Sequence, residues 1–234
     1  MVLRGKNTII YGDVRFGENV LIEDNVVIGH PSAAELQGCL DDLHAYASVE
    51  ELYHHKSQAP VVIGDNAIIR SGTIIYSGVT IGSNFDCSHH VLIREGCTIG
   101  DSVYIKSNTE IMKQVQIGNH CRLAGMIADY TIIGNHVSSF GSLTHRYGHQ
   151  AASLDRGPIL HDGCIVGREA TVIGEVHIYD YAVIASNALV NFDVPAGSLV
   201  VGPKGSIRTN KYLVPPDPAL VASGQRAMPL PQEQ

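Results

Sequence analysis

Two histidines in one irregular segment, His145 and His149, are the side chains of this chain best placed for acid–base chemistry. The sequence around them follows a strict repeat, which stops at residues 143–158. A loop of this length that projects from a regular fold is usually functional. Because the ordinary pKa of an imidazole is close to neutrality, such a side chain can remove a proton from a substrate. We take His145 as the first candidate for a general base and His149 as the second, the alternative being that they only order the loop.

A second polar group contains His89, His90 and Asn108. His90 and Asn108 are eighteen residues apart, so they stack on one corner if each coil of the fold has eighteen residues. Arg94 follows on the next side of the same coil. Such side chains could contact an acceptor substrate, and the alternative is a solvated ladder of surface residues.

The repeat that must position these groups has a period of six residues and runs through Val61–Ala128. The second to fourth positions of a block are sets such as Gly-Asp-Asn, which tolerate positive φ and sharp corners. The fifth position is small or β-branched in nearly every block. A fixed period of this kind marks a repeat architecture. The first positions are Ile63, Ile69, Ile75, Ile81, Cys87, Ile93, Ile99, Ile105, Ile111, Ile117 and Leu123.

Neither regular secondary structure alone explains this period. A helix buries positions three and four apart, and a strand buries alternate positions. A short strand followed by a corner gives six, and three such sides close a triangular coil whose copies stack about 4.8 Å apart through parallel-strand hydrogen bonds. An antiparallel meander is the alternative, but it would keep an unbroken phase only by accident. The sequence therefore predicts an all-β protein built as a parallel β-helix.

The repeat is already present in Ile10–Gly29 and is interrupted at residues 30–60. This segment favours helix, and we expect a pair of short helices with Ser32 and Ser48 as N-caps. Ser48 begins a Ser-x-x-Glu capping box. The insertion either packs on a coil or on a neighbouring subunit, or it covers a substrate.

The repeat changes phase after Leu123, and irregularities of this kind are common beside active sites. It resumes at Leu160, and the stretch AGSLVVGPKGSIR is then expected to leave the solenoid. The predicted organisation is a β-helix domain over 1–208, with a helical insertion at 30–60 and a projecting loop at 143–158, and an irregular tail at 209–234.

Composition excludes several classes of protein. The net charge of −7 and the lack of a basic cluster argue against a nucleic-acid-binding protein. The longest apolar runs have the length of strands, so no membrane span is expected. The first seven residues lack the apolar core of a secretory signal. Four of the five cysteines occupy inward repeat positions, and we interpret them as small reduced core residues of a cytoplasmic protein.

The repeat, the projecting loop and the ending Val194–Arg208 together resemble the hexapeptide-repeat acyltransferases, which have a left-handed parallel β-helix. The family ending reads roughly V-P-x-G-x-x-V-x-G-x-P-A-K, and here it is VPAGSLVVGPK, one residue shorter and without the Ala before Lys204. The stretch IYSGVTIGSNFDCSHHVLIREGCTIGDSVYI looks like sugar N-acetyltransferases of surface-polysaccharide pathways. The loop from Thr144 to Ile159 looks like the T-H-…-R-…-P-I loop of galactoside- and maltose-type O-acetyltransferases.

This resemblance implies a homotrimer with acetyl-CoA as donor and active sites in clefts between neighbouring solenoids. It implies that His145 is the general base. Lys204 and Arg208 match the basic end of the family ending, where the CoA phosphates commonly lie. The late coils would offer backbone groups to the pantetheine arm, at Ala185, Ser186 and Gly202.

Three alternatives stay open at this point. A γ-carbonic-anhydrase-like zinc enzyme uses the same solenoid, but its paired ligands show a His-x4-His spacing, which neither His145 with His149 nor His89 with His90 matches. A sugar-nucleotide-binding module without catalysis is the second alternative. An acyl-carrier-protein-dependent transferase of long acyl chains is the third, and it needs an apolar groove that the sequence does not show.

The favoured function is transfer of an acetyl group from acetyl-CoA to a sugar or a nucleotide-linked amino sugar, by direct attack on the thioester and without a metal. Residues around His89, His90, Arg94 and Asn108 are expected to bind the sugar acceptor. Surface polysaccharide or glycoconjugate biosynthesis is the pathway that the resemblance suggests. Neither nucleic acid nor a membrane is expected as a partner.

Overall fold

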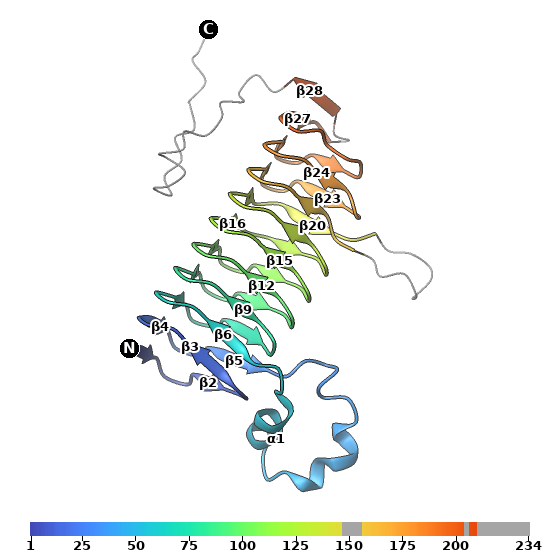
Figure 1. Cartoon of the computed structure of the whole chain (residues 1–234). Helices are drawn as coiled ribbons and strands as arrows, with labels where there is room; N and C mark the ends of the chain where they lie inside the picture. The colour runs from blue at the N-terminus through green and yellow to red at the C-terminus, as the bar shows by residue number, and fades with distance from the viewer. Residues whose placement is uncertain (147–155, 204–205, 210–234) are drawn as a thin grey trace.

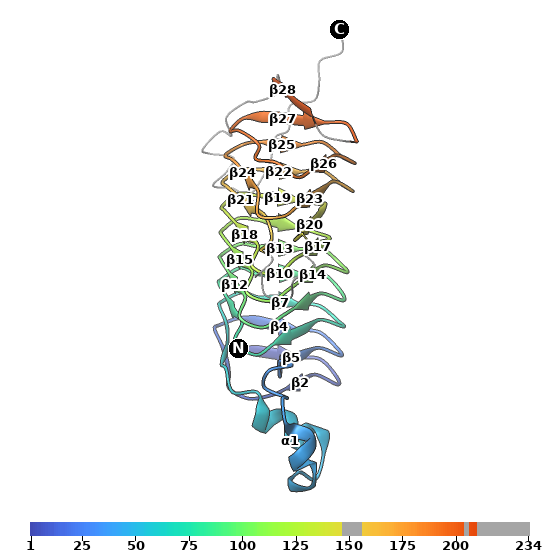
Figure 2. The same cartoon turned by 90° about the vertical axis from the view of Figure 1, so that its right-hand side faces the viewer.

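Each six-residue block forms a short strand followed by a corner, as the spacing predicts. In the computed structural model these strands wind into three-sided coils that stack from one end of the molecule to the other (Figures 1 and 2). The structure describes residues 1–146 and 156–203, together with the backbone of 206–209. The coils form a left-handed parallel β-helix, the reverse of the handedness that parallel crossovers usually have.

The three sides of the coils form three sheets, which we call the first, second and third sheet in the order in which the chain enters them. The first sheet contains β1 (Val2–Arg4), β4 (Val20–Ile22), β7 (Ile68–Ile69), β10 (Asp86–Cys87), β13 (Tyr104–Ile105), β16 (Arg122–Leu123), β19 (Ser138–Ser139), β22 (Ile165–Val166), β25 (Val183–Ile184), β27 (Ser198–Val201) and β28 (Ser206–Thr209). The second sheet contains β2 (Ile9–Ile10), β5 (Val27–His30), β8 (Ile74–Tyr76), β11 (Leu92–Ile93), β14 (Glu110–Ile111), β17 (Met126–Ile127), β20 (Ser142–Thr144), β23 (Thr171–Ile173) and β26 (Leu189–Val190). The third sheet contains β3 (Val14–Phe16), β6 (Val61–Ile63), β9 (Thr80–Ile81), β12 (Thr98–Ile99), β15 (Gln116–Ile117), β18 (Ile132–Ile133), β21 (Ile159–Leu160) and β24 (His177–Ile178).

The core is a set of stacked aliphatic columns inside the coils. Ile93 pairs with Ile75 on one side and with Ile111 on the other, so these coils are offset by eighteen residues. All three side chains are fully buried. Burial of each stabilises the fold by about 1.5–3 kcal/mol relative to exposure in water. The first positions of the repeat therefore form the core, as the sequence predicts.

The corners explain the Gly-Asp-Asn sets. One residue of each of these corners has a left-handed backbone, as at Asn66 (φ 57°) and Asn84 (φ 58°), where asparagine is well tolerated. The residue before each left-handed residue accepts a hydrogen bond from the neighbouring corner. The carboxylate of Asp101 accepts from the backbone N–H of Ser83 at 2.7 Å, and the side-chain oxygen of Asn119 accepts from the backbone N–H of Asp101 at 2.7 Å. A ladder of side-chain acceptors therefore satisfies backbone donors that the strands leave unpaired.

The phase change predicted after Leu123 is confirmed and has a specific form. The corner at Ala124–Gly125 is two residues shorter than its neighbours, because Ile111 pairs with Ile127 at an offset of sixteen. The next coil repeats this, with Ile127 paired to Leu143. A Cβ atom at Gly125 would lie 2.5 Å from the carbonyl oxygen of Gly141, so the two short corners approach too closely for a larger residue.

The insertion after β5 contains one 3₁₀ helix, η1 (Cys39–Ala45), and one α-helix, α1 (Val49–Lys56). Ser48 caps α1 as predicted, and its hydroxyl accepts from the N–H of Glu51 at 3.1 Å. The expected N-cap at Ser32 is wrong in part. Ser32 and Glu35 do form a capping box, but turns follow it instead of an α-helix, because Gly38 takes a left-handed backbone (φ 74°) that ends the helical path.

Additional elements lie at both ends of the solenoid. At the N-terminal end, α1 packs below the first coil, with the rings of Tyr11 and Tyr53 5.4 Å apart (Figure 1). At the other end the expectation that AGSLVVGPKGSIR leaves the solenoid is wrong. β27 continues the first sheet beside β25, and β28 pairs antiparallel with β27. The tail at 210–234 lies outside the described residues.

Candidate active site

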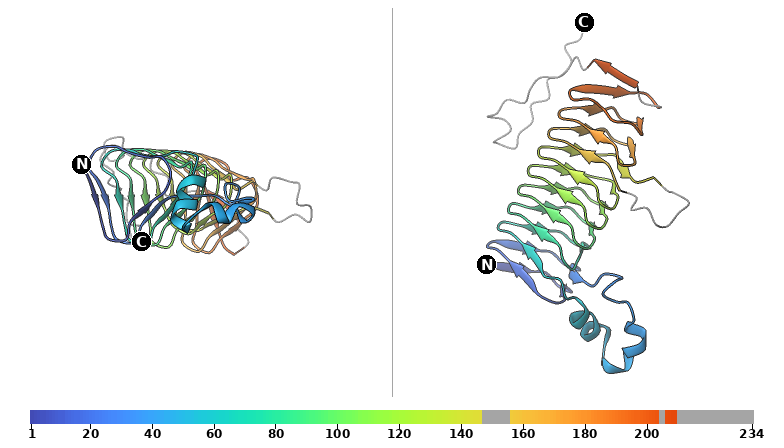
Figure 3. Two further views of the ribbon diagram at one scale, coloured as in Figure 1. Left: turned by 90° about the horizontal axis from the view of Figure 1, so that it is seen from below. Right: turned by 45° about the vertical axis from the view of Figure 1, so that its right-hand side comes forward.

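Both interruptions of the repeat leave the solenoid from the same edge. Residues 31–60 join β5 to β6, and residues 145–158 join β20 to β21, and each connection passes from the second sheet to the third. Figures 1 and 3 show the helical insertion and the bases of the later loop on one side of the molecule. We call this line the insertion edge. Apart from the helical insertion, the insertion edge consists of the corners that lead from the second sheet toward the third, at 76–78, 94–96, 112–114, 128–130, 144–146, 156–158, 173–175 and 191–193.

His145, the first candidate for a general base, lies on the insertion edge. It directly follows β20, whose Thr144 pairs with Ile173 in the next coil. The backbone carbonyl of Thr144 accepts from the N–H of Gly174 at 2.8 Å, which fixes the point where the loop leaves. The His145 side chain is half-buried. His149, the second candidate, lies outside the described residues.

The corner one coil before His145 carries a carboxylate, that of Asp129. Its Oδ1 accepts from the backbone N–H of Lys113 at 3.1 Å, and its Oδ2 lies 3.9 Å from the Lys113 ammonium. The returning limb of the loop is fixed to the same corner, because the N–H of Gly157 donates to the Asp129 carbonyl at 2.9 Å. A Cβ atom at Gly157 would lie 2.0 Å from the hydroxyl of Thr131, so this approach needs glycine. Asp129 and Lys113 therefore support the base of the loop.

Arg94 also lies on the insertion edge, two coils further toward the N-terminus than Asp129. Its guanidinium donates two hydrogen bonds to the carboxylate of Glu95, at 2.8 and 3.0 Å, and lies 4.9 Å above the ring of Tyr76. The hydrogen bonds to Glu95 raise the pKa of Arg94 further above its ordinary value. Arg94 thus shares an edge with His145, as an acceptor-binding residue would, and its role remains a prediction.

His89, His90 and Asn108 lie on another corner, the one between the first and second sheets. Their stacking is as predicted: the N–H of Asn108 donates to the carbonyl of His89 at 3.1 Å, and His90 and Asn108 both have φ of 58°. His89 is exposed, and its Nδ1 lies 3.7 Å from the Glu23 carboxylate. Within one chain, the structure does not bring these residues to the edge that carries His145.

The residues expected to bind CoA are also on the corner between the first and second sheets. Ala185 and Ser186 follow β25, and Gly202 follows β27 in the next coil. The N–H of Ala185 donates to the carbonyl of Val200 at 2.9 Å. Lys204 lies outside the described residues, as does the side chain of Arg208. Their contact with CoA remains a prediction.

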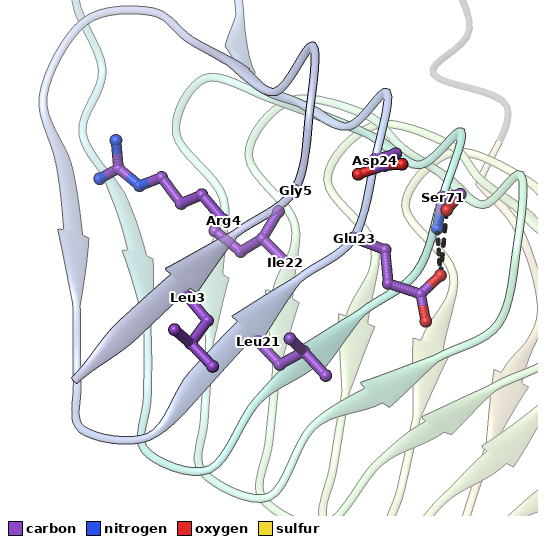
Figure 4. A pocket seen from close by; sticks show the side chains of 8 residues that line it. All are labelled: Leu3, Arg4, Gly5, Leu21, Ile22, Glu23, Asp24 and Ser71. Atoms are coloured by element: carbon purple, nitrogen blue, oxygen red, sulfur yellow. Dashed lines mark hydrogen bonds between the residues drawn. The ribbon is translucent and has the colours of Figure 1, made fainter.

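A hollow of about 350 Å³ lies on the same corner near the N-terminal end (Figure 4). Glu23 reaches across it and accepts hydrogen bonds from the backbone N–H and the hydroxyl of Ser71, at 3.1 and 3.0 Å. The residues that line the hollow come from the first three coils, and none of them lies on the insertion edge. Its lining residues are Leu3, Arg4, Gly5, Leu21, Ile22, Glu23, Asp24 and Ser71.

The inward cysteines are buried, as predicted, and burial raises the pKa of their thiols. The pKa is about 11 for Cys87 and Cys121 and about 12 for Cys97 and Cys164. Thiols with such values are not nucleophiles near neutral pH. In residues 1–146 and 156–203, no group of three or more His, Cys, Asp or Glu side chains is arranged to hold a metal ion. The described part of the chain also lacks a helix long and apolar enough to cross a membrane.

Sequence reasoning missed Asp129 and Lys113. The phase change after Leu123 could have revealed Asp129. It gives the coils that follow an offset of sixteen residues, and this offset places Asp129 on the same edge as His145, one coil earlier. Sequence reasoning treated Arg146 and Arg156, the last and first described residues on either side of the loop, only as part of the loop motif and assigned them no role.

Comparison with known proteins finds distant relatives, and this chain matches only part of the length of each. No family model matches the sequence. The bifunctional protein GlmU of Shouchella clausii is 26% identical over 180 residues, covering 69% of this chain and 39% of that protein. GlmU of Geotalea daltonii is 29% identical over 202 residues, covering 86% of this chain and 38% of that protein. The chain thus spans less than two fifths of the length of these relatives.

Among solved structures, the UDP-N-acetylglucosamine O-acyltransferase LpxA of Moraxella catarrhalis is similar with a TM-score of 0.49 and 15% identity, over 88% of this chain and 74% of that chain. The N-acyltransferase AntD of Bacillus cereus, solved as a point mutant in complex with dTDP and coenzyme A, has a TM-score of 0.40 and 15% identity, over 63% of this chain and 82% of that chain. With its six-residue repeat and its three parallel sheets, the chain is a left-handed parallel β-helix, and its sequence is similar to the GlmU proteins along most of the solenoid.

Proposed function

We propose that this protein is an acyltransferase that moves an acetyl group from acetyl-CoA to a sugar or a nucleotide-linked amino sugar. The observation that carries the proposal is the place of His145, at the root of the only long loop that interrupts the later coils among the described residues. The sequence resemblance to sugar acetyltransferases supports the donor and the class of acceptor. Surface polysaccharide or glycoconjugate biosynthesis is the corresponding pathway, and the cytoplasm the corresponding compartment.

In this proposal His145 removes the proton from the acceptor amine or hydroxyl as its nitrogen or oxygen attacks the thioester carbonyl. The tetrahedral intermediate then collapses, the carbon–sulfur bond breaks, and the CoA thiolate takes up a proton, so that the products are the acetylated sugar and free CoA. The attack is direct. A covalent acetyl-cysteine is disfavoured because burial keeps the inward thiols protonated.

We also propose that the active form is a homotrimer. His145 and Arg94 lie on the insertion edge, whereas His89, His90, Ala185 and Ser186 lie on the corner between the first and second sheets. An assembly in which the insertion edge of one chain faces that corner of its neighbour brings both groups into one cleft. Light scattering coupled to size-exclusion chromatography measures the mass, and a monomer with full activity would contradict this arrangement.

The test of the proposed function is a thiol-release assay with acetyl-CoA and a panel of amino-sugar nucleotides, hydroxyl-sugar nucleotides, free sugars and simple amines. Release of CoA with one class of acceptor is the expected result, and product mass then distinguishes N- from O-acetylation. Binding of a sugar nucleotide without consumption of acetyl-CoA would instead identify a non-catalytic binding module. Tight zinc in the purified protein, with no release, would favour the carbonic-anhydrase-like alternative.

A further inference from the structure

Two arginines flank the loop on the insertion edge, and both extend toward the C-terminal coils. Arg146 follows His145 directly, and its Nη2 donates to the backbone carbonyl of Asn191 at 3.0 Å. Arg156 is the first described residue after the loop, and its Nη1 lies 3.8 Å from the carboxylate of Glu175. The two guanidinium groups thus reach the same stretch of edge from opposite limbs of the loop.

A glycine on the corner beneath the two arginines, Gly174, leaves room for the Arg146 side chain. Gly174 has φ of 86°, and a Cβ atom there would lie 2.8 Å from Nε of Arg146 and 3.0 Å from its Cγ. Any other residue at this position would therefore displace the Arg146 side chain. Arg156 contacts Glu175, the next residue, so the two cations occupy neighbouring positions over one corner.

Neither cation is held by a tight carboxylate pair among the interactions of the described residues. Arg146 donates to a neutral backbone carbonyl. The pair between Arg156 and Glu175 is loose, with both side chains more than half exposed (55% and 54%). Glu175 and Asp193 are the carboxylates of the two corners that the arginines reach, and among the described contacts neither forms a close pair with a guanidinium group. Planar guanidinium forks bind phosphate oxygens in pairs, with charge-assisted hydrogen bonds.

We propose that Arg146 and Arg156, supported by Gly174, form a subsite for an organic diphosphate. The inference rests on the proposed function and deepens it. The subsite lies one to two coils beyond His145, or about 5–10 Å along the edge. Acetyl-CoA has a diphosphate joined to its thioester by a flexible arm, and a nucleotide-linked sugar has one joined directly to the acceptor. Either molecule can supply this group, and the binding experiment distinguishes the two sources.

The experiment measures binding of CoA, of pantetheine, which lacks the diphosphate, and of UDP-N-acetylglucosamine to the full chain by calorimetry. The variants are Arg146→Gln and Arg156→Gln, with Arg146→Lys to keep the charge and lose the fork. Arg15→Gln is the matched control, because it removes the same charge from a similarly exposed ion pair, that with Asp13, on β3 at the other end of the solenoid. Thermal unfolding of each variant checks that the fold is intact.

The expected result is that Arg146→Gln and Arg156→Gln each bind CoA about tenfold more weakly or worse and that Arg146→Lys is intermediate. Pantetheine binding in all variants and CoA binding in the Arg15→Gln control should be unchanged. A loss confined to UDP-N-acetylglucosamine would support the subsite and assign it to the acceptor. Equal affinities for both diphosphate ligands in the variants and the control would overturn it, even if the wild type releases CoA from acetyl-CoA. If the wild type binds no CoA, no nucleotide sugar and releases no thiol, the proposed function fails as well.

Discussion

The carboxylate of Glu35, in the helical insertion, accepts a hydrogen bond from the hydroxyl of Ser77, on the insertion edge of the solenoid, at 2.5 Å. The same carboxylate accepts from the backbone N–H groups of Ser32 at 2.7 Å and Gln58 at 3.0 Å. One side chain therefore joins the start of the insertion, its end and the coil that follows. This contact fixes the insertion to the edge on which His145 lies.

Removing this carboxylate should release the insertion. Glu35→Ala leaves several donors without their acceptor, and we expect a loss of about 1–3 kcal/mol from the stability of this segment. Limited proteolysis should then cut within residues 31–60 while the solenoid remains intact, and Ser77→Ala should have a smaller effect in the same direction. Unchanged proteolysis in Glu35→Ala would show that aromatic packing of α1 holds the insertion instead.

The same contact should depend on pH. Burial by itself would raise the pKa of Glu35, but hydrogen bonds from Ser77, Ser32 and Gln58 outweigh this effect and lower the pKa below its ordinary value of 4.5. The ionised form is therefore favoured in the folded protein, so its stabilisation is complete above about pH 4.5 and is lost as the pH falls through the lower folded-state pKa. Protease sensitivity of residues 31–60 measured from pH 7 to pH 3 should rise in that acidic range, and Glu35→Gln should remove the dependence.

The role of His145 is tested by substitution with alanine. Loss of a general base should lower kcat by about 10²–10⁴-fold while CoA binding is retained. His120→Ala is the control, because His120 lies on the corner between the third and first sheets, where its ring stacks on His136 at 4.9 Å. If the His145→Ala variant remains active, His149 or His89 becomes the candidate for the general base.

Substitution of Lys204 tests the predicted contact with acetyl-CoA. If it contacts a phosphate of CoA, Lys204→Ala should raise the KM for acetyl-CoA more than it lowers kcat, since the contact is made equally in ground and transition states. Steady-state kinetics at two salt concentrations measure this, and the difference should shrink at high salt. An unchanged KM would remove Lys204 from the donor site.

Removal of two buried hydroxyl groups should have opposite effects on the free energy of unfolding. Ser139 is fully buried and its hydroxyl has no hydrogen-bond partner among the described residues, so Ser139→Ala should be neutral or stabilise the fold by about 1 kcal/mol. Thr109 is equally buried, but its hydroxyl donates to the carbonyl of Lys106 at 2.6 Å, so Thr109→Val should destabilise by about 1 kcal/mol. Urea unfolding of both variants gives the comparison, and a destabilised Ser139→Ala would indicate a bound water at that site.

The cysteines should differ in reactivity in the native protein. Cys39, in η1, is partly exposed, whereas the other four are buried with a raised pKa. Alkylation at pH 8 should therefore modify Cys39 and spare the rest until the protein unfolds. Mass spectrometry of labelled peptides measures this, and rapid labelling of Cys164 in the native state would contradict the inward assignment.

The sequence by itself determined the solenoid, because every six-residue block carries its own strand, corner and core residue, and these local preferences agree with the global fold. It also located the insertion, the capping box at Ser48, the inward cysteines and the interruption at 143–158, although its first two residues belong to β20. These features depend on neighbours in the sequence and need no knowledge of distant contacts.

Only the tertiary structure decided which residues share an edge. Counting three coils of eighteen residues from His90 reaches Thr144, which would place His145 beside the corner that carries His90. Two shortened corners, at Gly125 and Gly141, move His145 on to the next corner instead, where it meets Arg94 and Asp129. The physical reason is that each coil stacks on the one before it, so a small change in the length of a corner shifts every later residue around the solenoid.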